Sequence, residues 1–253
     1  MKRRTALSAA VATLGLAVAG CDSPAPAGSS TAAPTARPTT PPTTAPPTPT
    51  LGPLPAEVVN GPRDRPNVAL TFHGQGDPKL VQQLLSEIEA GGARATVLAV
   101  GTWLTAEPAM AKRILDGGHE LGNHTQSHLA IADMSAAQAF AEVNLCAQTM
   151  KKLTGSIGTW FRPSQTVHST ATIQAQATKV GYPTCLSYDL DSLDYTDPGS
   201  AAVVHNTISA VHNGSIVSLH FGHQGTVTAM PALLDGLRQK GLRAVTMTEL
   251  MSR

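Results

Sequence analysis

Hydrophobic and polar positions alternate between two periods from about residue 57 to the C-terminus. Short apolar runs, typical of buried β-strands, are separated by segments whose apolar residues recur every three or four positions, as in amphipathic helices. Strands are predicted in this way over residues 67–72, 95–100, 119–122, 157–161, 184–188, 215–219 and 243–246. Helices are predicted over residues 79–90, 108–115, 135–153, 170–180, 200–211 and 231–239. Strands that alternate with helices indicate an α/β fold with a parallel sheet, either open or closed into a barrel.

The first 56 residues have a different composition. Lys2, Arg3 and Arg4 precede a mostly apolar run over 6–19, which is too short to span a bilayer and is typical of a secretory signal. Val18-Ala19-Gly20-Cys21 resembles the lipobox of bacterial lipoproteins, and an ordinary signal peptide is the alternative. Residues 22–56 are rich in Pro, Thr and Ala, which favours an extended tether.

We therefore predict three parts: a lipoprotein-type signal over 1–21, a tether over 22–56 and a folded domain over 57–253. The protein is expected to be exported and held by a lipid on Cys21 at the outer face of the cytoplasmic membrane. A formal net charge of +1 and few aromatic residues give no reason to expect nucleic acid binding. A monomer is expected.

The two remaining cysteines allow two interpretations. In an exported protein, Cys146 and Cys185 can form a disulfide. Alternatively, Cys146 is a core residue, because it shares one predicted helical face with Ala139, Val143 and Met150.

Residues capable of chemistry follow the predicted strands. His73 follows the first strand, His124 the third, Arg162 the fourth and Asp191 the fifth, and His220 ends the sixth. In a parallel α/β barrel the active site is built at the C-terminal ends of the strands. The pattern therefore predicts an enzyme site.

His124 and His128 are spaced so that one helical turn would place both rings on the same face. Two imidazoles in this arrangement can share a metal ion, with zinc as the usual occupant. The alternative is a pair of surface histidines.

These residues lie in motifs that resemble those of the NodB-homology polysaccharide deacetylases, a family of metal-dependent carbohydrate esterases. His124-Thr-Gln-Ser-His128 is similar to the family's metal motif, and Phe161-Arg162-Pro163 to its arginine motif. Asp191-Ser-Leu-Asp194-Tyr195 resembles Asp-x-x-Asp-Trp, and Leu219-His220 resembles Leu-x-His shortened by one residue.

The resemblance covers about residues 67–250. It implies a distorted (β/α) barrel of about seven parallel strands and a divalent metal ion, with zinc expected. It further implies removal of acetyl groups, N-acetyl groups foremost, from a cell-envelope polysaccharide or oligosaccharide.

The first motif differs from that of the family. Where the family has Thr-Phe-Asp-Asp-Gly-Pro, this chain has Thr71-Phe-His-Gly-Gln-Gly-Asp-Pro78, so His73 replaces the catalytic base and Gly74 replaces a metal ligand. One hypothesis is that a glycine-containing loop brings Asp77 to the metal, while Arg162 keeps His73 neutral as the base. In the alternatives, His73 only supports the ligands and Asp77 caps the following helix.

The remaining roles follow from the resemblance. His220 would be the general acid, oriented by Asp191, and Tyr195 and Leu219 would contact the substrate. A buried structural histidine is the alternative for His220. The competing function is a non-catalytic envelope protein that keeps the fold and the groove for glycan binding.

Overall fold

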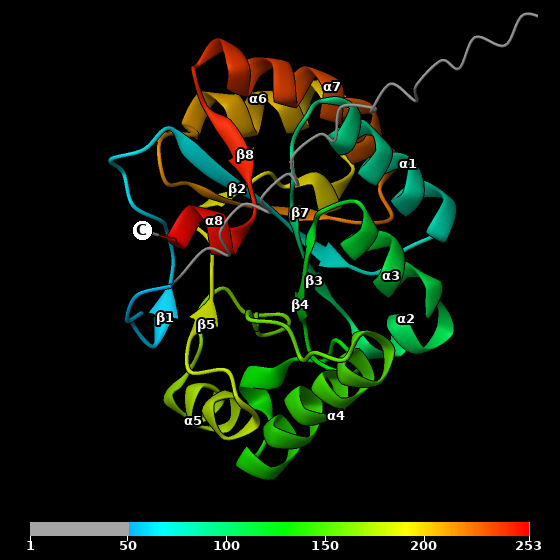
Figure 1. The fold of residues 1–253 in the computed structure, drawn as a ribbon, viewed down its shortest axis with the longest axis vertical. Helices are drawn as coiled ribbons and strands as arrows, with labels where there is room; N and C mark the ends of the chain where they lie inside the picture. Colours follow the sequence, from blue (N-terminus) through cyan, green and yellow to red (C-terminus); the bar gives the residue numbers. More distant parts are fainter. Residues whose placement is uncertain (1–50, 253) are drawn as a thin grey trace, which may run out of the picture. The chain divides into compact units, whose positions relative to one another are not determined.

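Parallel strands form the centre of the computed structural model, which describes residues 51–252 (Figure 1). Five of them are hydrogen-bonded in the order β4-β3-β2-β7-β6. Their bounds are β2 (Asn67–Gly74), β3 (Thr96–Ala99), β4 (Glu120–Asn123), β6 (Leu190–Asp191) and β7 (Ile216–His220). A short β8 (Arg243–Val245) pairs with the first residues of β2, and β1 (Glu57–Val58) pairs with β5 (Cys185–Leu186). Phe161 forms parallel bridges to Asn123 and Cys185, which connects the two groups of strands into a distorted barrel.

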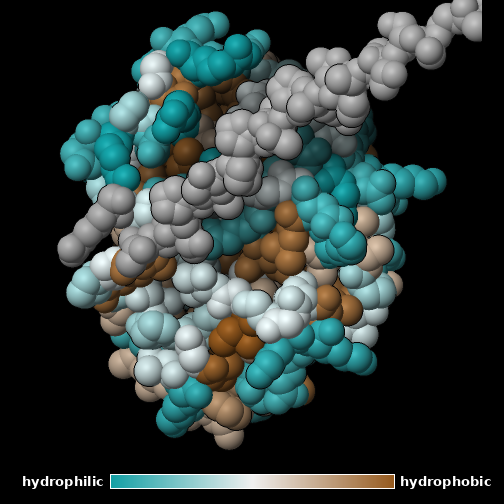
Figure 2. Space-filling model, viewed as in Figure 1, coloured by the Kyte–Doolittle hydropathy of each residue, from teal (hydrophilic) through white to brown (hydrophobic). Residues whose placement is uncertain are grey.

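Helices surround these strands (Figure 1). They are α1 (Pro78–Ala90), α2 (Gly101–Ala106), α3 (Ala109–Asp116), α4 (Ala136–Thr154), α5 (Ala171–Val180), α6 (Ser200–Ala210), α7 (Gln224–Gln239) and α8 (Met247–Met251). Two short 3-10 helices complete the described part of the chain: η1 (Ile131–Asp133) comes after β4, and η2 (Asp194–Thr196) comes after β6. Figure 2 shows mostly hydrophilic residues on the outer helices of this view. None of the helices in the described part of the chain is long and apolar enough to cross a membrane.

Most predicted elements are present, with informative differences. The strand expected over 157–161 is reduced to the bridge at Phe161, because Gly158 has a φ of 73° and breaks the extended run. Helix α7 begins at Gln224, not near Pro231, which lies inside the helix. The folded part begins by Leu51, earlier than expected, since Leu51 pairs with Ser252. The signal and lipobox predictions concern residues outside the described range.

Both cysteines of the folded part are buried and unpaired. Cys146 lies on the buried face of α4 with Ala139, Val143 and Met150. The structure thus agrees with the core interpretation of Cys146 and does not form the disulfide.

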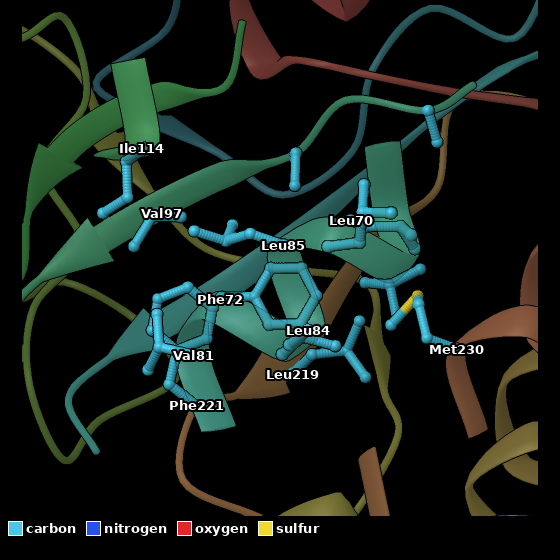
Figure 3. Packing of buried hydrophobic residues seen from close by; sticks show 14 of the residues in the cluster. Leu70, Phe72, Val81, Leu84, Leu85, Val97, Ile114, Leu219, Phe221 and Met230 are labelled. Atoms are coloured by element: carbon cyan, nitrogen blue, oxygen red, sulfur yellow. The ribbon is translucent and has the colours of Figure 1, made fainter. Parts of the chain in front are cut away.

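The two faces of β2 bury different kinds of residue. Val68, Leu70 and Phe72 face the helices and pack in the main apolar core (Figure 3). The ring centroid of Phe72 lies 5.3 Å from that of Phe221. The intervening residues Ala69, Thr71 and His73 face the barrel interior, because successive side chains of a strand point to opposite faces.

The register between β2 and β7 arranges the barrel interior in layers. Ala69 pairs with Ile216, Thr71 with Ser218, and His73 with His220. Residues paired in a parallel ladder point to the same face, so an apolar layer is followed by a hydroxyl layer and then by an imidazole layer. Polarity increases toward the C-terminal ends of the strands, where the histidines lie.

Gly74 ends β2 at a close approach to β3. A Cβ atom added at Gly74 would lie 2.7 Å from Val97 Cγ1 and 3.0 Å from Ala99 Cα. Real Cβ atoms do not approach a neighbour so closely, and the Ala99 contact is with backbone. The position therefore has no room for any side chain unless β3 moves.

We predict that Gly74→Ala lowers the free energy of unfolding by about 1–3 kcal/mol, because the added methyl group overpacks the β2–β3 contact. Urea denaturation measures the effect. Gly225→Ala is the matched control, because a Cβ there has no heavy atom closer than 3.9 Å and the residue lies in a helix. Equal stability of the wild type and the Gly74 variant would contradict the steric argument.

Candidate active site

Three histidines form a compact cluster at the C-terminal end of the barrel. His73 comes from β2, His124 directly follows β4, and His128 lies in the next loop. Each offers one ring nitrogen, and these nitrogens all lie within 4.8 Å of one another. His73 Nδ1 is 2.9 Å from His124 Nε2, and the ring centroids of His124 and His128 are 4.8 Å apart.

The loop after β4 is not the helical turn that we predicted. Thr125 and His128 have φ values of 68° and 54°, in the left-handed region. The side chain of Asn123 accepts a hydrogen bond from Thr125 N, and Thr125 Oγ1 accepts one from His128 N. These contacts turn the chain back on itself, which brings His128 to His124 without a helix.

Residues after Phe161 hold this loop in place. Gln165 Nε2 donates a hydrogen bond to the carbonyl of His128, with a distance of 2.7 Å, and Ser164 Oγ donates one to the carbonyl of Leu129. His124 Nδ1 lies 2.9 Å from the carbonyl oxygen of Arg162, so this nitrogen carries the proton and Nε2 faces the cluster. The arginine segment thus positions two of the three histidines.

The electrostatics of the cluster suit metal ligands. Burial lowers the pKa of both His73 and His124 well below the ordinary value, and it also lowers the pKa of His128. The neighbouring histidines and Arg162 act in the same direction on His73. The imidazoles are therefore neutral at pH 7, the form that coordinates a metal. A neutral His donor set with a fixed tautomer at His124 fits a divalent ion such as zinc.

Asp77 does not reach the cluster, which corrects one expectation. Its Oδ1 accepts a hydrogen bond from Lys79 N at 2.7 Å, so Asp77 is the N-cap of α1. Pro78 follows at the first helical position, where its fixed φ suits the start of a helix. The capping alternative therefore describes Asp77, and His73 is the third member of the cluster.

Each ring nitrogen of His73 has its own contacts. Beyond the contact to His124, its Nε2 lies 3.1 Å from Ser218 Oγ and 3.4 Å from Arg162 Nη1. Both ring nitrogens thus face other side chains. His73 is thus placed among the residues that could hold a metal ion.

Arg162 is buried in the hydroxyl layer below the histidines. Its Nη2 donates hydrogen bonds to Thr71 Oγ1 at 2.8 Å and to the carbonyl of Ser187 at 3.0 Å. Its guanidinium carbon lies 5.3 Å from the ring centroid of Tyr188. Burial lowers the pKa of Arg162 to about 9, a shift that Tyr188 and Asp191 oppose, so the group remains cationic at pH 7. Among the described residues, no carboxylate forms an ion pair with it.

His220 is paired with Asp194, not with Asp191 as predicted. His220 Nδ1 lies 2.8 Å from Asp194 Oδ1, and Asp194 Oδ2 accepts hydrogen bonds from His220 N and from Thr226 Oγ1. The turn after β6 explains why the partner is Asp194 and not Asp191. Leu193 has a φ of 58° and reverses the chain, so that Asp194 lies under His220. Burial raises the pKa of Asp194, but its hydrogen bonds, first that from His220, outweigh this and lower it.

A cavity of about 440 Å³ opens onto these residues. It is lined by His73, His128, Gln165, Thr166, Val167, Tyr188, Asp191, Tyr195 and His220. The ring of Tyr195 lies 5.2 Å from that of His220, so Tyr195 is placed at the cavity as expected.

Leu219 is not at the cavity, in contrast to the expectation that it contacts the substrate. It is fully buried in the core on the helix side of β7. Ser218 faces the interior instead and contacts His73. The alternation of β7 could have revealed this from the sequence, because residues that flank His220 by one position must point away from it.

Comparison with known proteins identifies the family of this chain. The family model for polysaccharide deacetylases matches residues 60–185. A peptidoglycan-N-acetylglucosamine deacetylase of Bacillus cereus is 30% identical over 194 residues, which cover 75% of this chain and 90% of the relative.

Solved structures have the same fold. A CE4 family pseudoenzyme from Bacillus anthracis superposes with a TM-score of 0.74 at 21% identity, covering 79% of this chain and 70% of that chain. A family 4 carbohydrate esterase from Streptomyces lividans, in complex with acetate, has a TM-score of 0.66 at 27% identity, covering 74% and 93%. The chain belongs to the polysaccharide deacetylase family.

Proposed function

We propose that the folded domain is a metal-dependent hydrolase that removes N-acetyl groups from the glycan of the cell envelope. The observation that carries this proposal is the common position of the three-histidine cluster and the His220–Asp194 pair at one cavity. The name of the Bacillus cereus relative supports peptidoglycan as the substrate.

A divalent ion bound by His73, His124 and His128 would supply Lewis-acid assistance to the acyl oxygen and to the hydrolytic water. Three neutral imidazoles favour zinc. His220, whose Nδ1 is held by Asp194, is placed to give its Nε2 proton to the departing amine. Tyr188 and Tyr195 line the cavity, where aromatic rings would pack against a sugar.

We predict that His73→Ala loses stoichiometric zinc, whereas Asp77→Asn keeps it, because Asn caps a helix about as well as Asp. Elemental analysis of the dialysed protein measures the bound zinc. His205→Ala is the matched control, since His205 is exposed on α6. Loss of zinc in the Asp77 variant with retention in the His73 variant would return Asp77 to the ligand set.

Acetate release from N-acetylated peptidoglycan fragments tests the activity itself. His220→Asn should keep the zinc and lower turnover by roughly 10²–10⁴-fold, the usual contribution of general acid–base catalysis. Unchanged turnover in this variant would remove His220 from the reaction.

A second candidate function is non-catalytic glycan binding. It is favoured by the absence of a carboxylate from the histidine cluster among the described residues, and by the likeness of the fold to that of a pseudoenzyme. A wild-type protein that binds the fragments and zinc but releases no acetate would establish this candidate over the first.

We further propose that the protein is exported and anchored through a lipid on Cys21, with the Pro- and Thr-rich segment as a tether to the membrane. The support is the small-residue sequence that leads into Cys21 after a short apolar run.

Cys21→Ser should release the protein from the membrane, because residues 22–50 contain no apolar segment that would replace the lipid. Fractionation after a salt wash measures the distribution. A variant that stays in the membrane fraction would contradict anchoring through Cys21.

A further inference from the structure

Hydrolysis at this site needs a group that accepts a proton from the attacking water. Position 74 has no side chain, Asp77 caps α1, and both nitrogens of His73 face other side chains. Asp194 is buried and its two oxygens accept three hydrogen bonds. The residues assigned so far therefore leave the proton without an acceptor.

Asp191 is the one carboxylate among the described residues that line the cavity. It ends β6, so it lies at the same end of the barrel as the histidines. Asp191 pairs with Ser218 in the β6–β7 ladder, and paired residues of a parallel ladder point to the same side. Since Ser218 faces the interior and contacts His73, Asp191 also faces the interior.

One of the two carboxylate oxygens of Asp191 is hydrogen-bonded to the protein, and the other can accept a proton. Oδ1 accepts a hydrogen bond from Leu193 N at 3.0 Å, which fixes the orientation of the group. Oδ2 has no hydrogen-bond partner among the residues that the structure describes. An oriented oxygen that opens onto the cavity is the arrangement that a proton acceptor requires.

Asp191 lies near a buried positive charge. Arg162 carries a buried positive charge and has no ion-pair partner among the described residues, and Asp191 is the carboxylate that acts on it electrostatically.

We propose that Asp191 is the catalytic base of the deacetylation, an assignment that rests on the proposed function. The O–H bond of a water molecule breaks as its oxygen forms a bond to the acyl carbon, and Asp191 Oδ2 takes the proton. The C–N bond then breaks, and the nitrogen receives a proton from His220 Nε2. The products are a carboxylic acid and a free amine, and the proton on Asp191 returns to His220 through solvent before the next cycle.

A structural role is the competing explanation, because Asp191 also supports the turn through Leu193 N. Asp191→Asn separates the two, since the amide oxygen still accepts that hydrogen bond but cannot take a proton. Asp189→Asn is the matched control: Asp189 is two residues earlier and its Oδ1 accepts a hydrogen bond from Ile216 N at the start of β7.

Acetate release from N-acetylated peptidoglycan fragments is measured between pH 5 and 9 at saturating zinc, with zinc content and thermal unfolding recorded for each variant. We expect Asp191→Asn to keep zinc and stability, to lower kcat by roughly 10²–10⁴-fold, and to lose the fall in rate toward low pH that a carboxylate base would cause in the wild type. Formate added to Asp191→Gly should restore part of the rate, which a purely structural role would not allow.

An Asp191→Asn variant with the wild-type pH profile, or one that loses zinc, would overturn the assignment while leaving the deacetylase function intact. A wild-type protein that releases no acetate would instead refute the proposed function, and the base assignment with it. The Asp189 control should match the wild type in rate and in pH profile.

Discussion

The rest of the site depends on the hydrogen bonds of the buried Arg162 guanidinium. A cation buried inside a barrel loses its hydration, and this cost must be offset by polar contacts. Arg162 obtains them from Thr71 on β2 and from the carbonyl groups of Leu186, at the end of β5, and of Ser187, which follows it. The same residue's own carbonyl fixes the tautomer of His124. One buried residue therefore supports the polar middle layer through its side chain and the orientation of His124 through its main-chain carbonyl.

The charge of Arg162 also affects the protonation of His73, which lies in the imidazole layer above it. A positive group 3.4 Å from His73 Nε2 opposes a second positive charge on that ring, in addition to the effect of burial. His73 is thereby kept neutral, as a ligand must be, in a position where the family motif has an acid. The stacking of His73 on His220, with ring centroids 4.3 Å apart, brings the cluster and the proposed acid into direct contact.

The sequence predicted the alternation of strands and helices because each element carries its own apolar period, as in the buried face of α1. It also placed His73, His124, Arg162 and His220 at one end of the barrel, since that follows from parallel strands alone. The sequence-based predictions were wrong where the conformation of a loop determines which side chains meet. The pairing of His220 with Asp194 instead of Asp191 depends on a turn that contains two left-handed residues, Leu193 and Asp197, and no apolar pattern indicates such residues. Asp77 was ambiguous because a residue before Pro78 suits a helix cap as well as a ligand.

The close packing at Gly74 limits which side chains the end of β2 can carry. A carboxylate at that position would need β3 to move, so it cannot be introduced there without a shift of the neighbouring strand. Substitutions at Val97 alone do not suffice either, because part of the obstruction is the backbone at Ala99 and Leu98. At this end of β2, a metal ligand can therefore come from position 73 but not from position 74 unless β3 shifts.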